Sequence, residues 1–273
     1  MKISLKVTIL AIYLKQFSEV HNVGDVLSAR VVAGISGLAV RTIGEAAFDG
    51  ANLIAAGSIA HWSDENSTLW GCGLVNDWIG PNGKPARVLA VRGKLTRDRL
   101  ASCGIPCGDL FGDPGLLVPE FIAPSLRKHA LGLVPHYVDR ENAFVQECRS
   151  AGAVVLDVSA APERFVESLT SCEGILSSSL HGIVLAHAYG IPAAWIRISG
   201  EVHGDGFKFF DYYSSLGLKR ADVQMLTPGP HSLEEMAGRC WKPASVGNLA
   251  QLRSSLVEAL PQLDITPAVV PTA

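Results

Sequence analysis

Short hydrophobic runs alternate along the chain with segments in which apolar residues recur at helical spacing. The clearest unit covers residues 173–196, where the apolar run 174–176 is too short for a helix and is typical of a buried strand end. Three serines follow it, and the apolar spacing over residues 183–188 predicts a helix that ends at Gly190. An extended segment begins directly afterwards. The pattern therefore predicts strand, tight turn, helix and strand, the repeating unit of a parallel α/β sheet.

The same alternation recurs on both sides of this unit. Strands are predicted over residues 7–14, 52–56, 68–73, 87–91, 131–135 and 154–158, and helices over residues 26–35, 95–100, 140–151, 162–170 and 246–260. A change in composition at residues 120–127 predicts a linker. We therefore expect an α/β fold of two Rossmann-like domains with parallel sheets, residues 1–122 and 123–260, with a cleft between them and a flexible tail at 261–273.

Composition limits the functions that the chain can serve. With 48% hydrophobic residues and a mean hydropathy of +0.26, its 273 residues can form a substantial core. The net charge of −3 lacks the basic face that nucleic-acid binding requires. The six cysteines are scattered without the paired spacing of a zinc site, so we expect no metal. The first apolar run is short, lies between Lys6 and Lys15, and precedes no cleavage site, which favours a soluble, cytoplasmic protein.

His181 lies at the first position of the central predicted helix, directly after Ser178, Ser179 and Leu180. The free N–H groups and the dipole of a helix N-terminus form an anion site. The same dipole disfavours an imidazolium in an empty site, whereas a bound phosphate and carboxylate would hold the proton. His181 therefore suits a proton donor. The alternative is a histidine packed against its own serine-capped turn.

Other candidate residues also follow predicted strands. Asp25 opens the first predicted helix, where simple capping is an alternative to a functional role. Gly57 and Ser58 form a turn at a strand's carboxyl end, where α/β folds place ligands. Arg92 at a strand tip suits recognition of carboxylate or phosphate. Lys208 lies in a glycine-containing loop and could contact an anion or remain solvated.

Several segments, taken in order, resemble the polysaccharide pyruvyl transferase family. They are NVGDVLSARVV, LIAAGSIAHW, VRGKLTRDRL, FGDPGLLVP, SSSLHGIVLAHAYGIPAAWI and GFKFFDYYSSLG, within residues 20 to 217. The resemblance implies a GT-B-like arrangement with the donor bound against the second domain. It also implies transfer of the pyruvyl group of phosphoenolpyruvate to a sugar diol of a polysaccharide or its lipid-linked precursor, with formation of a ketal and release of phosphate. Phosphoenolpyruvate is then the donor substrate, and no cofactor is expected.

The resemblance also implies roles for individual residues. His181 resembles the proton donor and anion contact, Arg92 the arginine that holds the donor, and Asp25 the acid near the acceptor hydroxyls. Many relatives carry arginine where this chain has Ser179. Arg92, Lys208 or Arg197 would then have to supply the missing contact with the anion.

Two other functions stay open at this stage. One is a GT-B glycosyltransferase that uses a nucleotide sugar, because it shares the two-domain plan. The other is a non-catalytic sugar-binding component of polysaccharide assembly, which the serine at position 179 favours. A lipid-linked acceptor would bring the protein to the inner face of the cell membrane as a peripheral component.

Overall fold

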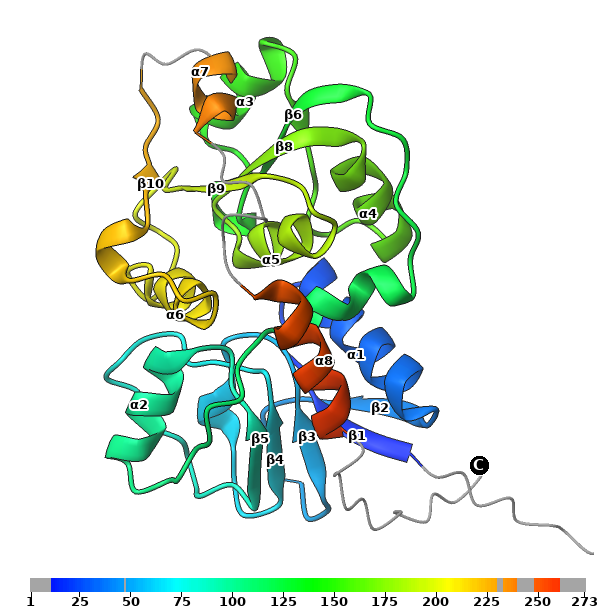
Figure 1. Cartoon of the computed structure of the whole chain (residues 1–273), viewed down its shortest axis with the longest axis vertical. Helices are drawn as coiled ribbons and strands as arrows, with labels where there is room; N and C mark the ends of the chain where they lie inside the picture. The colour runs from blue at the N-terminus through cyan, green and yellow to red at the C-terminus, as the bar shows by residue number, and fades with distance from the viewer. Residues whose placement is uncertain (1–10, 47, 230–232, 240–247, 261–273) are drawn as a thin grey trace, which may run out of the picture.

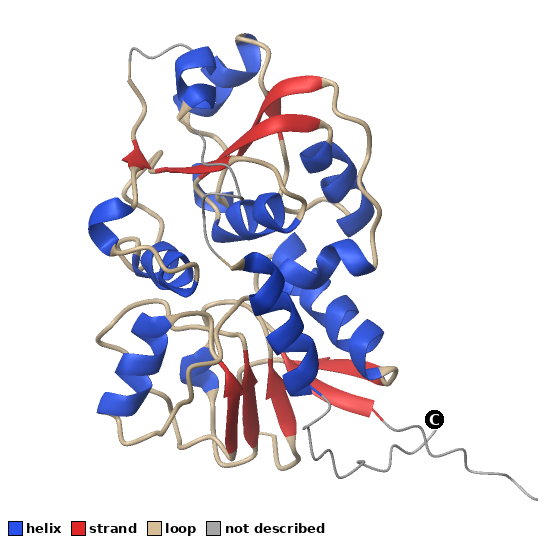
Figure 2. Ribbon diagram, viewed as in Figure 1, coloured by secondary structure: helices blue, strands red, loops and turns tan. Residues whose placement is uncertain are grey.

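The computed structural model describes residues 11–46, 48–229, 233–239 and 248–260. It contains two five-stranded sheets, and every strand pair in them is parallel. The sheets lie one above the other along the long axis, with helices between and around them (Figures 1 and 2). The predicted Rossmann-like α/β class with parallel sheets is therefore confirmed.

The first sheet has the strand order β2-β1-β3-β4-β5. Its strands are β1 (Ala11–Lys15), β2 (Ala39–Ile43), β3 (Asn52–Ile54), β4 (Ser67–Trp70) and β5 (Arg87–Ala90), accompanied by helices α1 (Val23–Ser36) and α2 (Lys94–Ser102) and by the 3-10 helices η1 (Ala60–Trp62) and η2 (Pro114–Glu120). Strand β2 was not predicted. It is an edge strand with largely exposed residues, so it lacks the buried apolar run that marks β3.

The second sheet has the strand order β10-β9-β8-β6-β7. Its strands are β6 (His129–Val134), β7 (Val154–Val155), β8 (Cys172–Ser177), β9 (Ala193–Ile196) and β10 (Met225–Leu226). The helices that follow η2 are η3 (Tyr137–Asp139), α3 (Ala143–Ser150), α4 (Pro162–Thr170), α5 (Leu180–Ala188), α6 (Phe207–Ser215), η4 (Arg220–Asp222), α7 (Leu233–Gly238) and α8 (Leu249–Ala259). The predicted helix over residues 162–170 has these bounds in the structure.

Both sheets have the same connectivity. The first strand of each sheet lies between the second and the third, so β1 lies between β2 and β3, and β6 between β7 and β8. In a doubly wound sheet the strand order reverses between the first and third strands, and ligands bind beyond the carboxyl ends of the strands at that point. The molecule therefore contains two such points, one at β1 and β3 and the other at β6 and β8.

The central unit has the predicted order β8, α5, β9. Ser179 is the N-cap of α5 and Leu180 its first residue, so His181 is the second helical residue and not the first. Gly190 follows the helix with a φ of 67°, the left-handed conformation that ends helices. The residues of α5 are apolar on almost all sides, because the helix is buried between β8 and β9 on one side and η2 on the other.

One hydrophobic core connects the two halves of the molecule. It includes Leu14 of β1, Leu117 of η2, Val184 of α5 and Tyr212 of α6. Helix α8, from the C-terminal part of the chain, packs against this core, since it contacts η2 and β5.

Helix α8 lies within the predicted second domain but packs on the first sheet (Figure 1). The indole nitrogen of Trp70 on β4 donates a hydrogen bond to the carbonyl oxygen of Leu256 at 3.0 Å. The predicted domain limits stay a prediction. The predicted tail at 261–273 lies outside the described residues.

A buried ion pair joins the two halves at the helices α2 and α6. Arg92, which follows β5, donates from Nε to Oδ2 of Asp211 at 2.9 Å, and both side chains are fully buried. Thr96 of α2 donates from its backbone nitrogen and its hydroxyl to the same carboxylate at 2.9 and 2.7 Å. Gly93 permits this approach, because a Cβ there would lie 1.8 Å from the Asp211 carbonyl oxygen. Helix α6 is thereby fixed against the N-terminus of α2.

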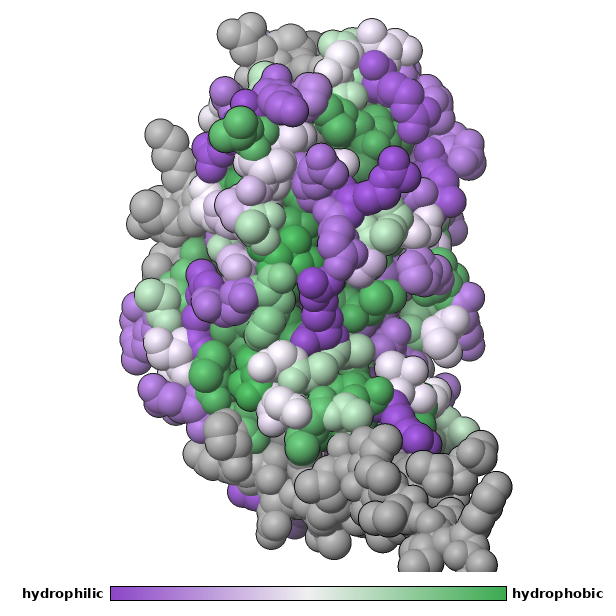
Figure 3. Space-filling model, turned by 90° about the vertical axis from the view of Figure 1, so that its right-hand side faces the viewer, coloured by the Kyte–Doolittle hydropathy of each residue, from purple (hydrophilic) through white to green (hydrophobic). Residues whose placement is uncertain are grey.

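Among the described helices, none combines the length and the apolar character that crossing a membrane requires. On the face in Figure 3, hydrophilic side chains gather over the upper, C-terminal half, and hydrophobic ones are more frequent on the lower half.

We expect Asp211→Asn to lower the free energy of unfolding by about 3 kcal/mol or more, because the buried guanidinium of Arg92 would lose its counter-charge. Urea denaturation measures the change. Glu120→Gln is the matched control, since Glu120 pairs with Arg253 at the surface and should change stability by less than about 1 kcal/mol. Equal effects of the two substitutions would contradict a special role for the buried pair.

Candidate active site

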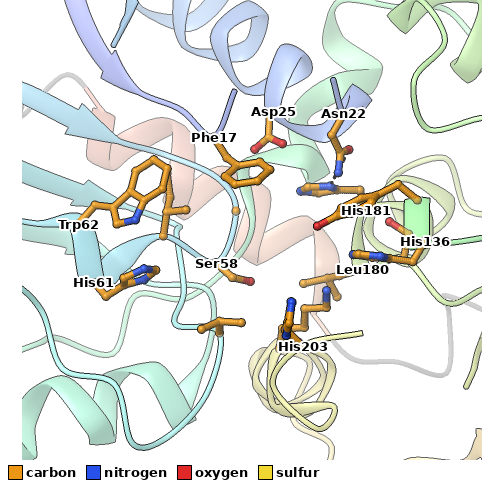
Figure 4. A pocket seen from close by; sticks show the side chains of 16 residues that line it. Phe17, Asn22, Asp25, Ser58, His61, Trp62, His136, Leu180, His181 and His203 are labelled. Atoms are coloured by element: carbon orange, nitrogen blue, oxygen red, sulfur yellow. Dashed lines mark hydrogen bonds between the residues drawn. The ribbon is translucent and has the colours of Figure 1, made fainter. Parts of the chain in front are cut away.

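A cavity of about 250 Å³ lies where the carboxyl ends of the two sheets face each other. The first half contributes residues that follow β1, β3 and β4, and the second half contributes residues that follow β6, β8 and β9 (Figure 4). The complete lining is Phe17, Asn22, Asp25, Gly57, Ser58, Ile59, His61, Trp62, Val75, His136, Tyr137, Ser179, Leu180, His181, His203 and Lys208. The reversal points of both sheets thus open onto one cavity.

His181 is positioned by the N-termini of two helices. It belongs to the first turn of α5, and its ring packs directly on Gly24 of α1, where a Cβ would lie 2.1 Å from the ring. Its Nδ1 lies 3.3 Å from Oδ1 of Asn22, which also accepts a hydrogen bond from the Gly24 nitrogen. Because Asn22 Oδ1 is an acceptor, Nδ1 of His181 carries the proton, and Nε2 keeps a free lone pair.

The His181 imidazole is neutral in this environment. Burial lowers its pKa to about 4, and the positive charges of Lys208 and Arg92 act in the same direction. The direction agrees with the expectation from the helix dipole. Burial and the two cations cause it, so an anion that neutralises Lys208 would raise the pKa of His181 again.

Asp25 lies on the other side of Gly24 and also faces the cavity. It belongs to the first turn of α1, whose N-cap is Asn22, so Asp25 is not the cap. Its side chain is buried, and its Oδ1 lies 3.5 Å from the position that a Cβ on Gly57 would occupy. Burial first and the charge of Asp113 second raise the pKa of Asp25 to about 7. Such a carboxyl group can accept and release a proton near neutral pH.

Lys208 is the cation that lines the cavity. It comes from the first turn of α6, and burial lowers its pKa to about 8. Ser179 and Leu180 line the same wall at the start of α5, and the Ser179 side chain makes no capping hydrogen bond. The first N–H groups of α5 can therefore serve an anion. Arg197, the other candidate for an anion contact, instead pairs with Asp205.

Arg92 and Ser178 lie behind the cavity wall. Arg92 donates to Asp211, to the Leu74 carbonyl oxygen at 2.6 Å and to Ser58 Oγ at 2.9 Å, and Ser58 itself lines the cavity. Arg92 is fully buried and is not part of the cavity lining, and its predicted role in holding the donor stays a prediction. Ser178 is 1% exposed and is hydrogen-bonded within the second half.

Several lining residues were not selected from the sequence. Asn22 lies in the NVGD segment, but its contact with His181 spans 159 residues and leaves no local signal. His136 follows the predicted strand 131–135 in the same way that His181 follows β8, so its position at a strand end was the available signal. Phe17, Ile59, Trp62 and Val75 form an apolar part of the wall, which hydrophobic pattern alone assigns to the core.

No metal centre is evident in this cavity. Among the residues that the structure describes, no three His, Cys, Asp or Glu side chains are grouped to hold a metal ion.

Comparison with known proteins confirms the family resemblance. Residues 83–200 match the family model of the polysaccharide pyruvyl transferases. The matched segment contains Arg92 and the block from Ser178 to His181, whereas Asp25 and Lys208 lie outside it.

Two curated relatives match longer parts of the chain than the family model does. "Uncharacterized protein L143" of Acanthamoeba polyphaga mimivirus is 34% identical over 174 residues, which are 60% of this chain and 60% of the relative. "Succinoglycan biosynthesis protein ExoV" of Rhizobium meliloti is 28% identical over 154 residues, 55% of this chain and 46% of the relative. The chain thus spans about half to three fifths of these relatives. A crystal structure of the protein KP1_0663 from Klebsiella pneumoniae aligns at a TM-score of 0.47 and 9% identity, covering 82% of this chain and 94% of that one.

The raised pKa of Asp25 makes stability depend on pH in a defined direction. Between about pH 4 and pH 7 the unfolded chain ionises Asp25 while the folded chain keeps it protonated, so wild-type stability falls as the pH rises. Asp25→Asn resembles the protonated form. We expect its stability advantage over the wild type to grow across this window and level off above pH 7, at roughly 2–4 kcal/mol.

Urea unfolding of both proteins at pH 4 to 8 measures this difference. Asp49→Asn is the control, because Asp49 is exposed and its substitution should change stability by less than about 0.5 kcal/mol. An Asp25→Asn advantage that is equally large at pH 4 and pH 8 would contradict a raised pKa.

Proposed function

We propose that this protein transfers the pyruvyl group of phosphoenolpyruvate to a sugar diol in polysaccharide biosynthesis. The observation that carries the proposal is the position of His181 between two helix N-termini, with its Nε2 lone pair free and with Asp25 and Lys208 in the same cavity. This set combines a proton donor, a base and a binding site for an anion. The match of residues 83–200 to the pyruvyl transferase family supports the same reaction.

The reaction requires proton transfers that His181 and Asp25 could perform. The methylene carbon of the enol phosphate gains a proton from His181 and becomes a methyl group. One sugar hydroxyl gives its proton to Asp25 as its oxygen bonds to the neighbouring carbon. The second hydroxyl then displaces phosphate from that carbon and closes the ketal. Two hydroxyl protons are lost overall, one balancing the new methyl group and the other leaving with phosphate.

The donor's negative charges would activate the proton donor. Phosphoenolpyruvate carries a phosphate and a carboxylate, which suit Lys208 and the first turn of α5. Binding of these charges offsets the positive field of Lys208 that lowers the pKa of His181. His181 is then neutral without donor and able to hold a proton once the donor is bound.

The proposed arrangement is GT-B-like, with a donor site on the second half and an acceptor site on the first. The limits 1–122 and 123–260 belong to this proposal. The acceptor hydroxyls would lie near Asp25, beside the apolar wall of Phe17 and Trp62. A lipid-linked polysaccharide precursor as acceptor would bring the protein to the inner face of the cell membrane from the cytoplasm.

We expect the purified protein to release phosphate from phosphoenolpyruvate only when a diol-bearing saccharide acceptor is present. His181→Ala should reduce the rate by about 10²-fold or more, because general acid catalysis is lost. The exposed His129 provides the control, since His129→Ala should keep the wild-type rate. Wild-type turnover in His181→Ala would refute the assigned proton donor. Thermal protection by a nucleoside diphosphate, but not by phosphoenolpyruvate, would indicate a glycosyltransferase instead.

Lys208→Met should raise the KM for phosphoenolpyruvate by about tenfold to a hundredfold, because a charge-assisted contact is lost. The pKa of Lys208 is lowered to about 8, so wild-type kcat/KM should fall as the pH rises above about 8. The variant should lack that fall. Steady-state kinetics with phosphoenolpyruvate from pH 6 to 10 measures both effects, and an unchanged alkaline limb in the variant would contradict the role of Lys208.

A further inference from the structure

His136 lies at the carboxyl end of β6, across the second reversal point from His181, and lines the cavity. Its side chain is buried apart from the face toward the cavity (Figure 4). A chain of hydrogen bonds fixes its backbone: the His136 nitrogen donates to Ser178 Oγ at 2.8 Å, and that hydroxyl donates to Asp139 Oδ2 at 2.6 Å. The serine block that precedes α5 therefore positions a second histidine in addition to His181.

The hydrogen bond at the ring Nδ1 indicates which nitrogen of His136 carries the proton. His136 is the N-cap of η3, and its Nδ1 accepts from the Val138 nitrogen at 3.5 Å. A neutral imidazole that accepts at Nδ1 carries its proton on Nε2. The ring is neutral, because burial lowers its pKa to about 3, and Lys208, His181 and His203 act in the same direction. His136 and His181 thus have opposite tautomers: the former has an Nε2–H donor and the latter a bare Nε2.

The positive charge in the wall around His136 comes from Lys208. The ammonium group of Lys208 can attract an anion but does not fix its orientation. An arginine would instead supply several N–H donors in a rigid plane. Ser179 lines the same cavity and brings a hydroxyl without charge. An Nε2–H group of His136 in this wall would add the directed hydrogen bond that Lys208 alone does not fix.

We propose that His136 is a substrate-binding residue whose neutral Nε2–H donates a hydrogen bond to an anionic oxygen of the donor, next to Lys208. The inference rests on the proposed function, because it deepens the description of the donor site. The ligand class is a small phosphate- or carboxylate-bearing anion. The bond requires no charge on the ring, so it persists across the neutral pH range.

Two substitutions separate this role from the structural role of His136. His136→Asn keeps an N-cap acceptor for Val138 in η3 but removes the donor that reaches the cavity. His136→Gln keeps an N–H donor at longer reach and weakens the cap. His129→Asn on the exposed amino end of β6 is the matched control. Isothermal titration calorimetry with phosphoenolpyruvate and with inorganic phosphate, on the full chain, measures binding in each.

We expect His136→Asn to bind phosphoenolpyruvate about tenfold to a hundredfold more weakly than wild type at an unchanged Tm, with partial recovery in His136→Gln. The ratio of wild-type to His136→Asn affinity should stay constant from pH 6 to 8. Equal affinity of wild type and His136→Asn overturns the inference and leaves the proposed function standing. If this affinity ratio instead rises about tenfold for each pH unit toward acid, the bond requires a protonated ring, and the assignment of a neutral donor is overturned. If the wild type binds phosphate but not phosphoenolpyruvate, the proposed function fails. The anion contact of His136 is then tested by comparing the phosphate affinities of wild type and His136→Asn.

Discussion

The ion pair between Arg92 and Asp211 is the interaction on which the geometry of the cavity depends. It places a guanidinium and a carboxylate, both fully buried, at the junction of the two halves. Each charge is compensated by further hydrogen bonds, from Thr96 to the carboxylate and from the guanidinium to Ser58 and the Leu74 carbonyl. A buried pair of this kind tolerates little displacement, since separating the partners leaves a charge without solvent. Helix α6, which carries Lys208, is thereby held over the cavity.

Two sheets with the same strand order then determine what the cavity contains. Each sheet brings loops and a helix N-terminus to its own reversal point, and the two points face each other. The first contributes Asp25 and the aromatic wall, and the second contributes His136 and His181. Burial shifts the pKa values of these groups in opposite directions: it raises the pKa of the Asp25 carboxyl group and lowers those of the two imidazoles. All three groups can thus be uncharged close to neutral pH, while Lys208 keeps a positive charge over most of that range.

This division of charge suits a site that takes up a small polyanion. Neutral groups cost less to bury than charged ones, and the arrival of negative charge favours their protonated forms. Two glycines permit close contacts around the cavity. A side chain at Gly24 would collide with His181, and a side chain at Gly93 would collide with α6. The close packing at these glycines therefore fixes the positions of His181 and of α6 at the cavity.

The sequence by itself determined the α/β class, the unit β8–α5–β9 and the placement of His181 at a helix start, because hydrophobic periodicity and glycine stops act over a few residues. It also placed Asp25, Gly57, Ser58 and Lys208 among the candidates that the cavity brings together. Only the tertiary structure decided that Arg92 is paired with Asp211, 119 residues away, and that Asn22 holds the ring of His181. The edge strand β2 and the place of His136 in the cavity wall were decided there as well. Contacts between distant segments depend on how the two sheets pack, and a local pattern of polar and apolar positions carries no record of that packing.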